Sequence, residues 1–475
     1  MKSVRAIEHF FLYQKLLCNT CYCERNSIAL FLLHNQNNLM KKKLVYITGT
    51  LLVSFFGFSQ DTLSISKSEL LQKISEKNLQ IKIAEKNYQS AKADYNQSRA
   101  LFLPNIAVSH TGISTTNPLM AFGSKLNQEI LTASDFNPAL LNDPANTQNF
   151  ATKFEIQQPL INMDGIYGRQ AAKTKMEAFQ LQTERTKEYL ELEVFKSYMQ
   201  LQLAYKAVKV LEKANTTGKA NLKLVQNYFQ QGLLQKTDLL NVQVRVNEIA
   251  NQLQYAKSNV QNASDYLAFL LNEDTKDKIY KPSEALENTI AIETINVSLS
   301  ENRKDIQAMN KSTTAYQKMY MSSKMNFLPR LNAFGSYELY DKNFLGTSAK
   351  GYLVGAQLSW NVFDGYKTIG KMEKAKADFQ KAEVETEQYK KQSQLELNKT
   401  NRQLLDAENK VNLSQLAFEQ SQEAYRIRQN RFTQGLEKTT DLLQSETQMI
   451  QKELEHLQAI FEYNFTKQYL QFLTK

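Results

Sequence analysis

The chain has 475 residues, too many for one ordinary compact core, yet it contains only 15 glycines and 7 prolines, which favours long helices over several globular domains. Its formal net charge is +10. Residues 1–59 hold 7 Lys and Arg against 2 Glu, a net of +5, which leaves +5 for residues 60–475. No compact basic cluster with interleaved aromatic residues occurs in the sequence, so nucleic acid is not an expected partner.

The N-terminal region has the pattern of a secretory leader that begins inside the chain. Met40 is followed by three lysines and then by about 15 mostly apolar residues, a run too short for a comfortable membrane span. Gly57 and Ser59 supply the small residues of a cleavage site. We therefore expect a signal peptide over 40–60, preceded at 1–39 by an upstream extension or a mis-called start. A retained N-terminal membrane anchor is the alternative.

Cysteine and histidine usage argues against metal and thiol chemistry. All three cysteines, Cys18, Cys21 and Cys23, lie upstream of the predicted signal peptide. His110 and His456 are the two histidines that follow it, and they are far apart in the sequence. The sequence contains no Gly-rich phosphate loop, HExxH or GxSxG motif. We therefore expect no cofactor, no metal site and no catalytic site, so the protein is not expected to be an enzyme.

Residues 61–272 are predicted to form the first of two structural repeats. Apolar periodicity and strand-like alternation give these elements in chain order: a helix over 63–100, a strand over about 105–115, a Pro-containing polar loop over 113–148, a strand over about 149–160, a long helix over 164–231 and a returning helix over 237–271. Asp164 is the expected N-cap of the long helix. A helix of that length would extend about 100 Å at about 1.5 Å per residue.

Residues 299–475 repeat this order after a connector over 273–298. The predicted elements are a helix over 300–325, strands over about 331–340 and 350–362, a long helix over 364–434 and a closing helix over 440–473. Phe327-Leu328-Pro329 echoes Phe102-Leu103-Pro104, and Asp364-Gly365 echoes Asp164-Gly165. The predicted fold class is mainly α with a membrane β-barrel, built from two tandem helix–β-hairpin–long helix–helix repeats.

One sequence phrase occurs in both repeats, at Asn227–Leu240 and at Asn430–Leu443. Phe, Gln, Gly, Leu, Thr, Asp, Leu and Leu recur in register, within long segments that lack proline. The glycine would end one helix and the Thr-Asp pair would cap the next. Each repeat is therefore expected to contain a tight turn between two long helices.

The predicted strands have the length of strands that cross a bilayer at a tilt. Four strands from one chain cannot close a barrel, and an open edge in lipid would leave backbone groups unpaired at several kcal/mol each. Transmembrane strands would therefore require a dimer, trimer or tetramer, with eight, twelve or sixteen strands. The aromatic residues of the strands would form an interfacial girdle, or else an ordinary soluble core: Phe150, Phe154, Tyr337, Tyr352 and Trp360.

Together these features resemble the TolC family of outer-membrane efflux proteins over essentially all of residues 61–475. The Phe-Leu-Pro boundaries, the Asp-Gly helix starts and the two Gly-Leu…Thr-Asp turns carry the resemblance by their order and spacing. The resemblance implies a homotrimer, with a twelve-stranded barrel among outer-membrane lipid and an α-helical barrel through the periplasm. It also implies an export duct that docks a periplasmic adaptor (membrane fusion) protein and is driven by an inner-membrane pump of the RND or ABC type.

The same resemblance places the two turns at the periplasmic end of the duct. Gly232, Leu233, Gly435 and Leu436 match the tip positions associated with adaptor contact. A glycine at such a position lets the backbone of a partner approach closely. The tip is therefore the expected adaptor-docking surface.

The periplasmic gate is expected beside these turns. Asp238 and Asp441 match carboxylates near the closed entrance, with helix capping as their alternative role. Three positions depart from the best-known family pattern. Phe432 stands where a gate tyrosine is usual, Glu437 where an arginine is usual, and Gln444 where an inner aspartate is usual. The phenolic hydrogen bond, the cationic lock partner and the inner carboxylate ring are therefore not expected here.

Two other functions fit the same residues. A duct dedicated to type I protein secretion would share the fold, and the sequence does not separate it from small-molecule efflux. A secreted structural coiled-coil protein with small β-hairpins is the more distant alternative, because long helices commonly serve as spacers. The expected location is the cell outer membrane, with an extension into the periplasm.

Overall fold

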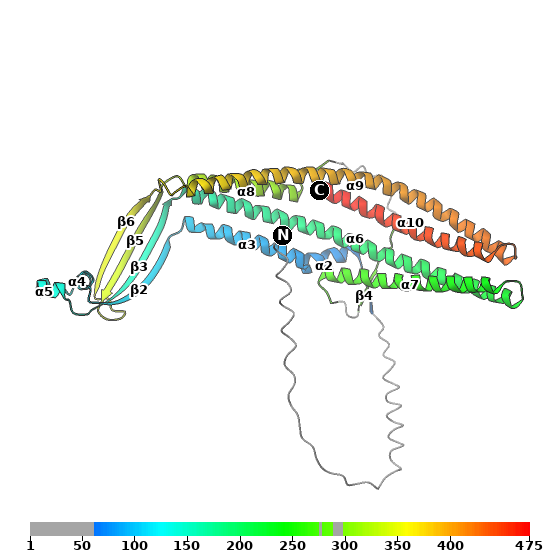
Figure 1. The fold of residues 1–475 in the computed structure, drawn as a ribbon, viewed down its shortest axis with the longest axis horizontal. Helices are drawn as coiled ribbons and strands as arrows, with labels where there is room; N and C mark the ends of the chain where they lie inside the picture. The colour runs from blue at the N-terminus through cyan, green and yellow to red at the C-terminus, as the bar shows by residue number, and fades with distance from the viewer. Residues whose placement is uncertain (1–60, 275–277, 288–297) are drawn as a thin grey trace, which may run out of the picture. The chain divides into compact units, whose positions relative to one another are not determined.

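The computed structural model describes these residues: 61–274, 278–287 and 298–475 (Figure 1). The predicted signal peptide over 40–60 and the upstream extension over 1–39 lie outside the described residues, as does part of the predicted connector over 273–298. Within the described ranges, no helix carries an apolar run sufficient to traverse a bilayer.

The described chain consists mainly of helices, with a four-stranded sheet and a two-stranded sheet. In chain order the elements are β1 (Asp61–Ile65), α2 (Lys67–Lys77), α3 (Leu79–Gln97), η1 (Ser98–Leu101), β2 (Asn105–Thr115), α4 (Pro118–Asn127), η2 (Ala133–Phe136), α5 (Pro138–Asn142), β3 (Thr147–Ile161), α6 (Met163–Gln230), α7 (Lys236–Leu271), β4 (Lys278–Pro282), α8 (Lys304–Met325), β5 (Arg330–Asp341), β6 (Ala349–Ser359), α9 (Lys367–Thr433) and α10 (Thr439–Thr474).

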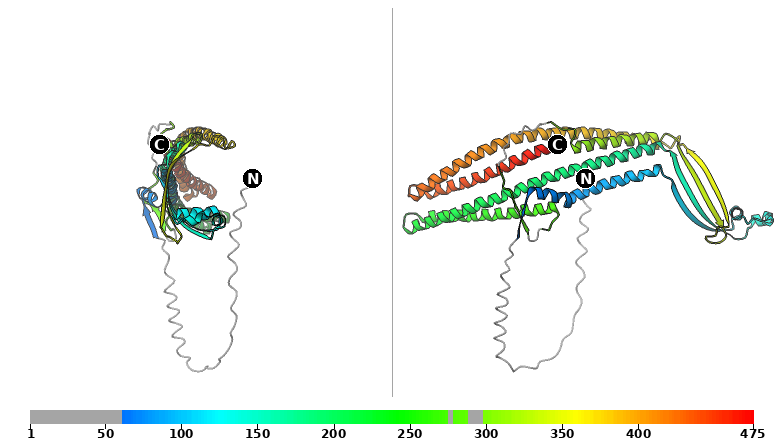
Figure 2. Two further views of the ribbon diagram at one scale, coloured as in Figure 1. Left: turned by 90° about the vertical axis from the view of Figure 1, so that its left-hand side faces the viewer. Right: turned by 180° about the vertical axis from the view of Figure 1, so that it is seen from behind.

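The two halves of the chain repeat one arrangement of helices. The α6 helix has 68 residues and α9 has 67, so each extends about 100 Å at about 1.5 Å per residue. The α7 helix returns along α6, and α10 returns along α9, so that each pair ends in a tight turn (Figures 1 and 2). The shorter α3 and α8 both pack against α6, and α8 also contacts α9, which joins the two halves.

The four-stranded sheet joins the two repeats by backbone pairing. Its strand order is β2-β3-β5-β6, and every neighbouring pair is antiparallel. The β3–β5 pairing places Phe154 opposite Tyr337 and Lys153 opposite Glu338. Within the described chain, β2 and β6 are the two edges of this sheet.

The two faces of the sheet differ in polarity. Residues directly opposite in an antiparallel pair share a face, so Val108, Phe154, Tyr337 and Tyr352 form one row across all four strands. The side chains in line with this row are mostly apolar, and the following are exposed: Ile106, Val108, Phe154, Ile156, Tyr337, Tyr352, Val354 and Leu358. The other face carries Lys153, whose ammonium lies 3.5 Å from Glu155 and 3.6 Å from Glu338.

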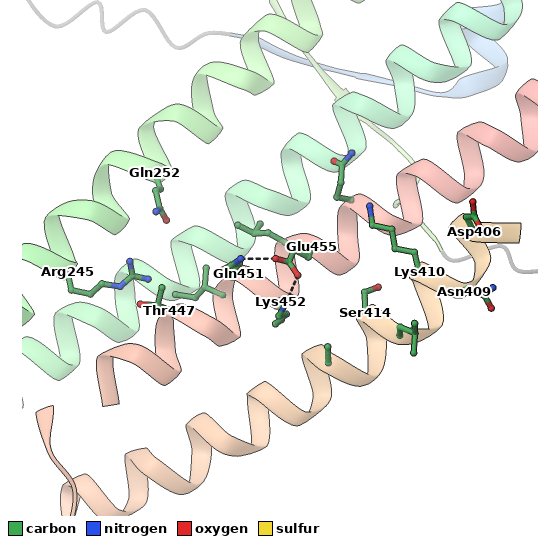
Figure 3. A pocket seen from close by; sticks show the side chains of 15 residues that line it. Arg245, Gln252, Asp406, Asn409, Lys410, Ser414, Thr447, Gln451, Lys452 and Glu455 are labelled. Carbon is green, nitrogen blue, oxygen red and sulfur yellow. Dashed lines mark hydrogen bonds and ion pairs between the residues drawn. The ribbon is translucent and has the colours of Figure 1, made fainter. Parts of the chain in front are cut away.

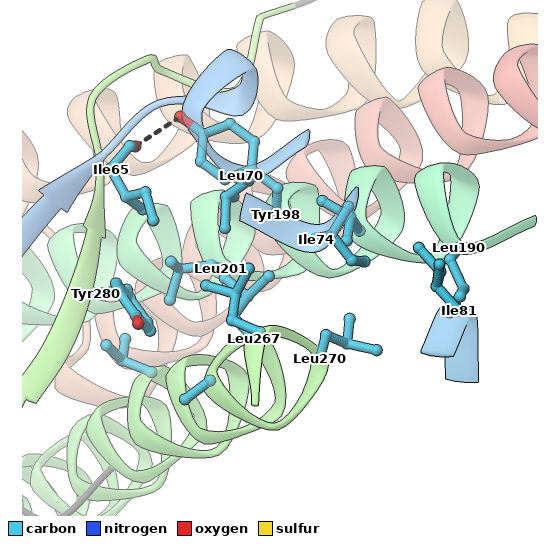
Figure 4. Packing of buried hydrophobic residues seen from close by; sticks show 14 residues of the cluster. Ile65, Leu70, Ile74, Ile81, Leu190, Tyr198, Leu201, Leu267, Leu270 and Tyr280 are labelled. Carbon is cyan, nitrogen blue, oxygen red and sulfur yellow. Dashed lines mark hydrogen bonds between the residues drawn. The ribbon is translucent and has the colours of Figure 1, made fainter. Parts of the chain in front are cut away.

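The largest buried cluster lies where β1, α2 and β4 cover the middle of α6 and the end of α7 (Figure 4). Leu70, Leu201 and Leu267 are fully buried there. Burial of a side chain of this size stabilises by about 1.5–3 kcal/mol. The Tyr198 hydroxyl lies 3.3 Å from the Ile65 carbonyl oxygen and donates to it. The start of the described chain is thus anchored on α6.

The single helix predicted over 63–100 is wrong, because its first residues form β1 and its remainder is divided at Asn78. The β1 strand pairs in parallel with β4, a strand of the connector that the sequence did not predict. Asn78 has an extended backbone, and its side chain accepts hydrogen bonds from the Gln80 and Ile81 amides at 2.8 and 3.2 Å. It also donates to the Leu270 carbonyl at 2.7 Å. Asn78 therefore starts a new helix rather than continuing the old one.

The predicted N-cap of α6 is also wrong. Asn162 caps the helix, since its side chain accepts from the Gly165 amide at 3.1 Å. Asp164 lies inside the first turn and forms an ion pair with Arg330, at 2.6 Å between Oδ2 and Nη2. Asp164 therefore connects the start of α6 to the start of β5, a contact between the two repeats.

The second long helix begins at Lys367, three residues after its predicted start. Gly365 and Tyr366 both have positive φ, 65° and 76°, which interrupts a right-handed helix. Asp364 still contributes to the helix start, because its Oδ1 accepts from the Thr368 amide at 3.2 Å.

The long loop predicted over 113–148 is not a loop throughout, because it contains α4, η2 and α5. Pro118 and Pro138 occupy the first positions of α4 and α5, and Asn117 and Asn137 are their N-caps. Proline is tolerated at the first helical position, where its missing N–H has no intrahelical partner. The Asn-Pro pairs here mark helix starts.

Candidate channel tip and membrane-facing sheet

The two predicted turns have nearly the same backbone. Gly232 and Gly435 adopt left-handed φ values of 73° and 74°, and each ends its helix as expected. The Leu233 amide donates to the Tyr228 carbonyl, and the Leu436 amide donates to the Arg431 carbonyl, both at 2.9 Å. These are the closing hydrogen bonds of a glycine-terminated helix. The exposed leucines therefore project beside a glycine that has open space around it.

The two predicted gate aspartates make different contacts. Asp238 lies in the first turn of α7, where its Oδ2 accepts from the Gln235 amide at 3.2 Å, so it caps the helix. Asp441 lies at the same position of α10, but its Oδ2 is 3.8 Å from Arg428. The Thr-Asp pairs were expected to cap both helices. Asp238 does so, whereas Asp441 lies near an arginine of the preceding helix.

Glu437 is the centre of an ion-pair cluster that the sequence did not predict. Its carboxylate accepts from Arg428 at 3.0 Å and from Arg431 at 2.9 Å, both on the last turns of α9. Arg431 also donates to the Leu436 carbonyl at 3.3 Å. The sequence did contain a signal for this cluster. Arg428 and Arg431 stand three residues apart, and Glu437 follows soon after them, two residues beyond Gly435. Leu234 stands at the equivalent position of the first turn and packs against a buried apolar cluster instead.

Phe432 is buried between the two helix pairs, with 2% of its surface exposed. It packs with Val225 and Val242 of the first pair and with Tyr425 of its own helix. The neighbouring Tyr228 places its ring 6.1 Å from that of Phe432, and its hydroxyl donates to the Thr433 carbonyl at 3.1 Å. A tyrosine of the first turn therefore supplies a hydrogen bond between the helix pairs.

Gln444 stands where the family pattern has an inner aspartate, and its side chain is exposed. A buried carboxylate, that of Glu446, lies two residues further along the sequence. Glu446 is 1% exposed and receives a hydrogen bond from the Asn221 side chain at 3.4 Å. Asn221 also donates to the Tyr425 hydroxyl at 3.3 Å. The other oxygen of Glu446, Oε2, has no hydrogen-bond partner among the described residues.

This buried network has the expected electrostatic consequences. Burial raises the pKa of Glu446 above its ordinary value of 4.5, and the charge of Arg245 and the Asn221 hydrogen bond oppose the rise. Burial also raises the pKa of Tyr425 to about 12. The sequence contained a signal for Glu446, because it occupies the stripe of buried positions Leu442, Glu446 and Ile450 on α10.

A groove of about 1080 Å³, lined by both polar and apolar side chains, adjoins this network (Figure 3). Arg245 and Gln252 of α7 lie on one side of it, and residues of α9 and α10 line the rest. Within it, Glu455 accepts hydrogen bonds from Gln451 and Lys452 at 2.8 and 2.7 Å. Its walls carry charges of both signs. Among the described residues, no group of His, Cys, Asp and Glu side chains could hold a metal ion.

The predicted aromatic residues of the sheet fall at three levels. Phe154, Tyr337 and Tyr352 lie in the single row across the strands described above. Phe150 lies nearer the loops, where its ring stacks with His110 at 6.0 Å between centroids. Trp360 lies at the opposite end, just after β6, and its Nε1–H donates to the Phe327 carbonyl at 3.0 Å.

Comparison with known proteins agrees with this architecture. The model of the family described as outer membrane efflux protein matches residues 70–273 and 297–473, one segment in each repeat. The chain belongs to the outer membrane efflux protein family. The resemblance to TolC-family proteins is therefore confirmed. As a member of this family the protein is an efflux channel of the outer membrane that extends into the periplasm.

Solved structures share the fold. CusC is similar with a TM-score of 0.74 and 15% sequence identity, over 88% of this chain and 95% of that chain. The CmeC outer membrane channel of Campylobacter jejuni has a TM-score of 0.74 and 16% identity, over 96% of this chain and 93% of that one. The open state of the MtrE outer membrane channel of Neisseria gonorrhoeae has a TM-score of 0.70 and 15% identity, over 86% and 88%. No curated protein matches by sequence.

The family match favours efflux over the two other functions that fit the sequence, a type I protein secretion duct and a secreted coiled-coil protein. The family consists of channel proteins rather than enzymes. The features that matter most in this outer membrane efflux protein are therefore the sheet and the helical tip.

The Glu437 cluster generates a first prediction for the tip of this efflux protein. The Glu437→Gln variant loses both arginine pairs, so local opening of the α9–α10 turn should increase roughly two- to five-fold, as expected for pairs worth about 0.2–1 kcal/mol. Trypsin cleavage at Arg428 and Arg431 measures this opening. Glu423→Gln is the matched control, because Glu423 pairs with Arg426 on the exposed side of the same helix. Equal cleavage rates in the two variants would contradict the prediction.

Glu446 generates a second prediction, for pH dependence. A carboxyl group whose pKa is raised on folding binds more protons in the folded state than in the unfolded state. The free energy of unfolding therefore falls as the pH rises above 4.5, where the group begins to lose its proton in the unfolded chain. The Glu446→Gln variant should therefore raise the unfolding temperature at pH 7, and the gain should shrink as the pH falls to 4.5 or below. Thermal unfolding in detergent at several pH values measures it, with the exposed Glu385→Gln as control. A loss of stability at pH 7 would show that Glu446 is a productive partner of Arg245.

Proposed function

We propose that the chain works as a homotrimer, in which three four-stranded sheets close a twelve-stranded outer-membrane barrel and the long helices form a tunnel through the periplasm. The observation that carries this proposal is a sheet with two unpaired edges and one exposed apolar face. In lipid each unpaired backbone group costs several kcal/mol, so the β2 edge of one copy must pair with the β6 edge of the next. The apolar row of Val108, Phe154, Tyr337 and Tyr352 would face outer-membrane lipid.

The aromatic residues would act as an anchor at the borders of the membrane. Tyrosine and tryptophan are enriched at membrane–water interfaces, where one part of the side chain is apolar and the other is polar. Trp360 at the helical end and Phe150 at the loop end lie on either side of the row that contains Phe154, Tyr337 and Tyr352. These five side chains would form the girdle of the barrel.

The helical tip would dock a periplasmic adaptor protein. Leu233 and Leu436 are 68% and 63% exposed, and each follows a glycine at which an added Cβ would meet no atom within 4 Å. Exposed leucines beside an open backbone suit a groove of a partner helix pair. The chain supplies no energy source of its own in this proposal, so an inner-membrane pump of the RND or ABC type would drive transport through the adaptor.

The gate would lie just behind the tip. Asp238, Asp441, Phe432, Glu437 and Gln444 all belong to the last turns of the helix pairs. Two contacts would hold the pairs together, the Tyr228 hydrogen bond to the Thr433 carbonyl and the packing of Phe432. Opening would require these contacts to break, while the arginine pairs of Glu437 would keep the second turn intact.

The barrel assignment predicts opposite results for neighbouring substitutions in β6. Tyr352→Lys would place a charge on the lipid face, at a cost of about 2–4 kcal/mol near the bilayer midplane, and should reduce the assembled trimer in outer-membrane fractions. Leu353→Lys is the matched control, because Leu353 lies on the other face and should tolerate the charge. Trimer content is measured by electrophoresis in mild detergent. Equal loss in both variants, or wild-type protein that stays soluble without detergent, would contradict the proposal.

The docking assignment predicts that Gly435→Trp abolishes efflux while trimer formation and membrane insertion persist, because the bulky side chain blocks the approach of the partner. Accumulation of a dye substrate in cells measures efflux. Gly435→Asn is the control, since asparagine tolerates the left-handed backbone and is much smaller, and it should keep most of the efflux. Efflux that survives the tryptophan would show that the adaptor does not dock at this turn.

A further inference from the structure

The insertion between β2 and β3 is the clearest structural difference between the two repeats. It contains α4, η2 and α5, whereas the β5–β6 connection consists of residues 342–348 alone. Its elements are held in place: Lys125 pairs with Asp135 at 2.8 Å, and the rings of Phe122 and Phe136 meet edge to face at 5.7 Å. The insertion is therefore a small folded unit rather than an open loop.

The insertion packs on the polar face of the sheet. Its Gln128 side chain donates to the Gln148 carbonyl at 2.8 Å and to the Asn149 side chain at 2.9 Å. Asn149 lies in line with Lys153 along β3, so the end of α4 contacts the loop end of the face that carries the charged residues. Because the opposite face is the apolar one, the polar face lines the lumen of the proposed barrel, and α4 lies over the end of the lumen that is farthest from the long helices.

The surface that α4 turns away from the sheet is apolar. Its buried side consists of Ala121 and Ser124, with Gln128 directly after the helix. Leu119 and Leu126, seven residues apart on the opposite side, are 85% and 54% exposed. Further exposed apolar side chains of the insertion are Met120, Ile130, Phe136 and Leu140. Exposed apolar residues in this number on one small unit indicate an interaction surface.

The exposed face of α4 also suits close contact with another helix. Gly123 lies between Leu119 and Leu126 on that face, and an added Cβ there would meet no atom within 4 Å. Glycine inside an exposed helix costs about 1 kcal/mol relative to alanine. A helix that keeps glycine on the side away from its own sheet has room there for the backbone of a second helix.

We propose that the exposed face of α4 contacts the same face in the two neighbouring copies of the chain, and that the three insertions together close the outer mouth of the barrel with an apolar plug. This inference rests on the proposed trimer. The occupant is a second copy because pairing of the β2 and β6 edges brings three identical insertions to one rim, all on the lumen side. No other partner is needed to cover the apolar surface.

The dimensions allow a plug of three helices over the mouth of the barrel, beyond the ends of the strands, where no side chains of the strands narrow the space (Figure 1). Twelve strands spaced about 4.8 Å apart and tilted by about 40° give a backbone diameter of about 24 Å. Three helices, each about 10–12 Å wide with its side chains, need about 22–26 Å when packed around one axis. A narrow constriction lined by Leu119 and Leu126 would exclude water and ions, as hydrophobic constrictions do in channels.

Disulfide cross-linking tests the contact directly. Single cysteines are placed at Leu119 or Leu126 in the full chain, with the native cysteines at 18, 21 and 23 replaced by serine, and the cells are treated with a mild oxidant. Both Leu119→Cys and Leu126→Cys should give covalent dimers of the chain in denaturing gels. Phe344→Cys should not, although Phe344 in the β5–β6 connection is 68% exposed, between the values of the two leucines. Intact trimers without cross-links at either leucine would overturn the plug, whereas absence of trimers would overturn the proposed function instead.

Access to the lumen from outside the cell provides a second measurement. A reporter, Ser336→Cys, lies on the polar face of β5 and should react slowly with a bulky hydrophilic maleimide added to whole cells. Leu119→Glu with Leu126→Glu should speed this labelling several-fold, because the added charges open and hydrate the plug. Asn127→Glu with Asn142→Glu adds the same charge at exposed polar positions of α4 and α5 and should leave the rate unchanged. Labelling that is equally fast in the reporter alone and in both double variants would show that the mouth of the barrel is open, which would contradict the plug.

Discussion

Backbone hydrogen bonding at the two edges of the sheet is the constraint on which the rest of this structure depends. Strands β2, β3, β5 and β6 form three internal ladders, but the outer sides of β2 and β6 are not paired within the described chain. The apolar side chains of one face make water a poor environment for that face, and lipid cannot pair the edges. In the proposed trimer, pairing between copies of the chain satisfies the edges, and outer-membrane lipid covers the apolar face.

Closure of the sheet into the proposed barrel would also determine where the helices go. Because β3 continues into α6 and β6 continues into α9, each copy would contribute two long helix pairs below the same rim. Contacts such as Asp164 with Arg330, at 2.6 Å, hold the start of a helix against the start of a strand of the other repeat. This contact holds the sheet and the long helices together where they meet.

The two turns at the tip have nearly the same backbone conformation, but their side chains make different contacts. The glycines agree within one degree in φ, yet the first turn is closed by apolar packing of Leu234 and the second by the ion pairs of Glu437. Ion pairs with solvent-exposed arginines are weakened by salt, whereas apolar packing is not. The stability of the second turn should therefore depend more on ionic strength than that of the first. The two turns differ in this property although they share one repeated sequence.

The sequence by itself determined the order of the elements, the duplication, the two glycine turns and the family, because these depend on local periodicity, on the special backbone freedom of glycine and on motif spacing. Tertiary structure decided the rest. Asn78, which caps α3 with its own side chain, is fixed on α7 by its hydrogen bond to Leu270, Glu446 accepts a hydrogen bond from Asn221 of α6, and the end of α4 is anchored to β3 through Gln128. Each of these outcomes depends on a partner distant in the chain, and local pattern carries no information about which distant residue will fill that role.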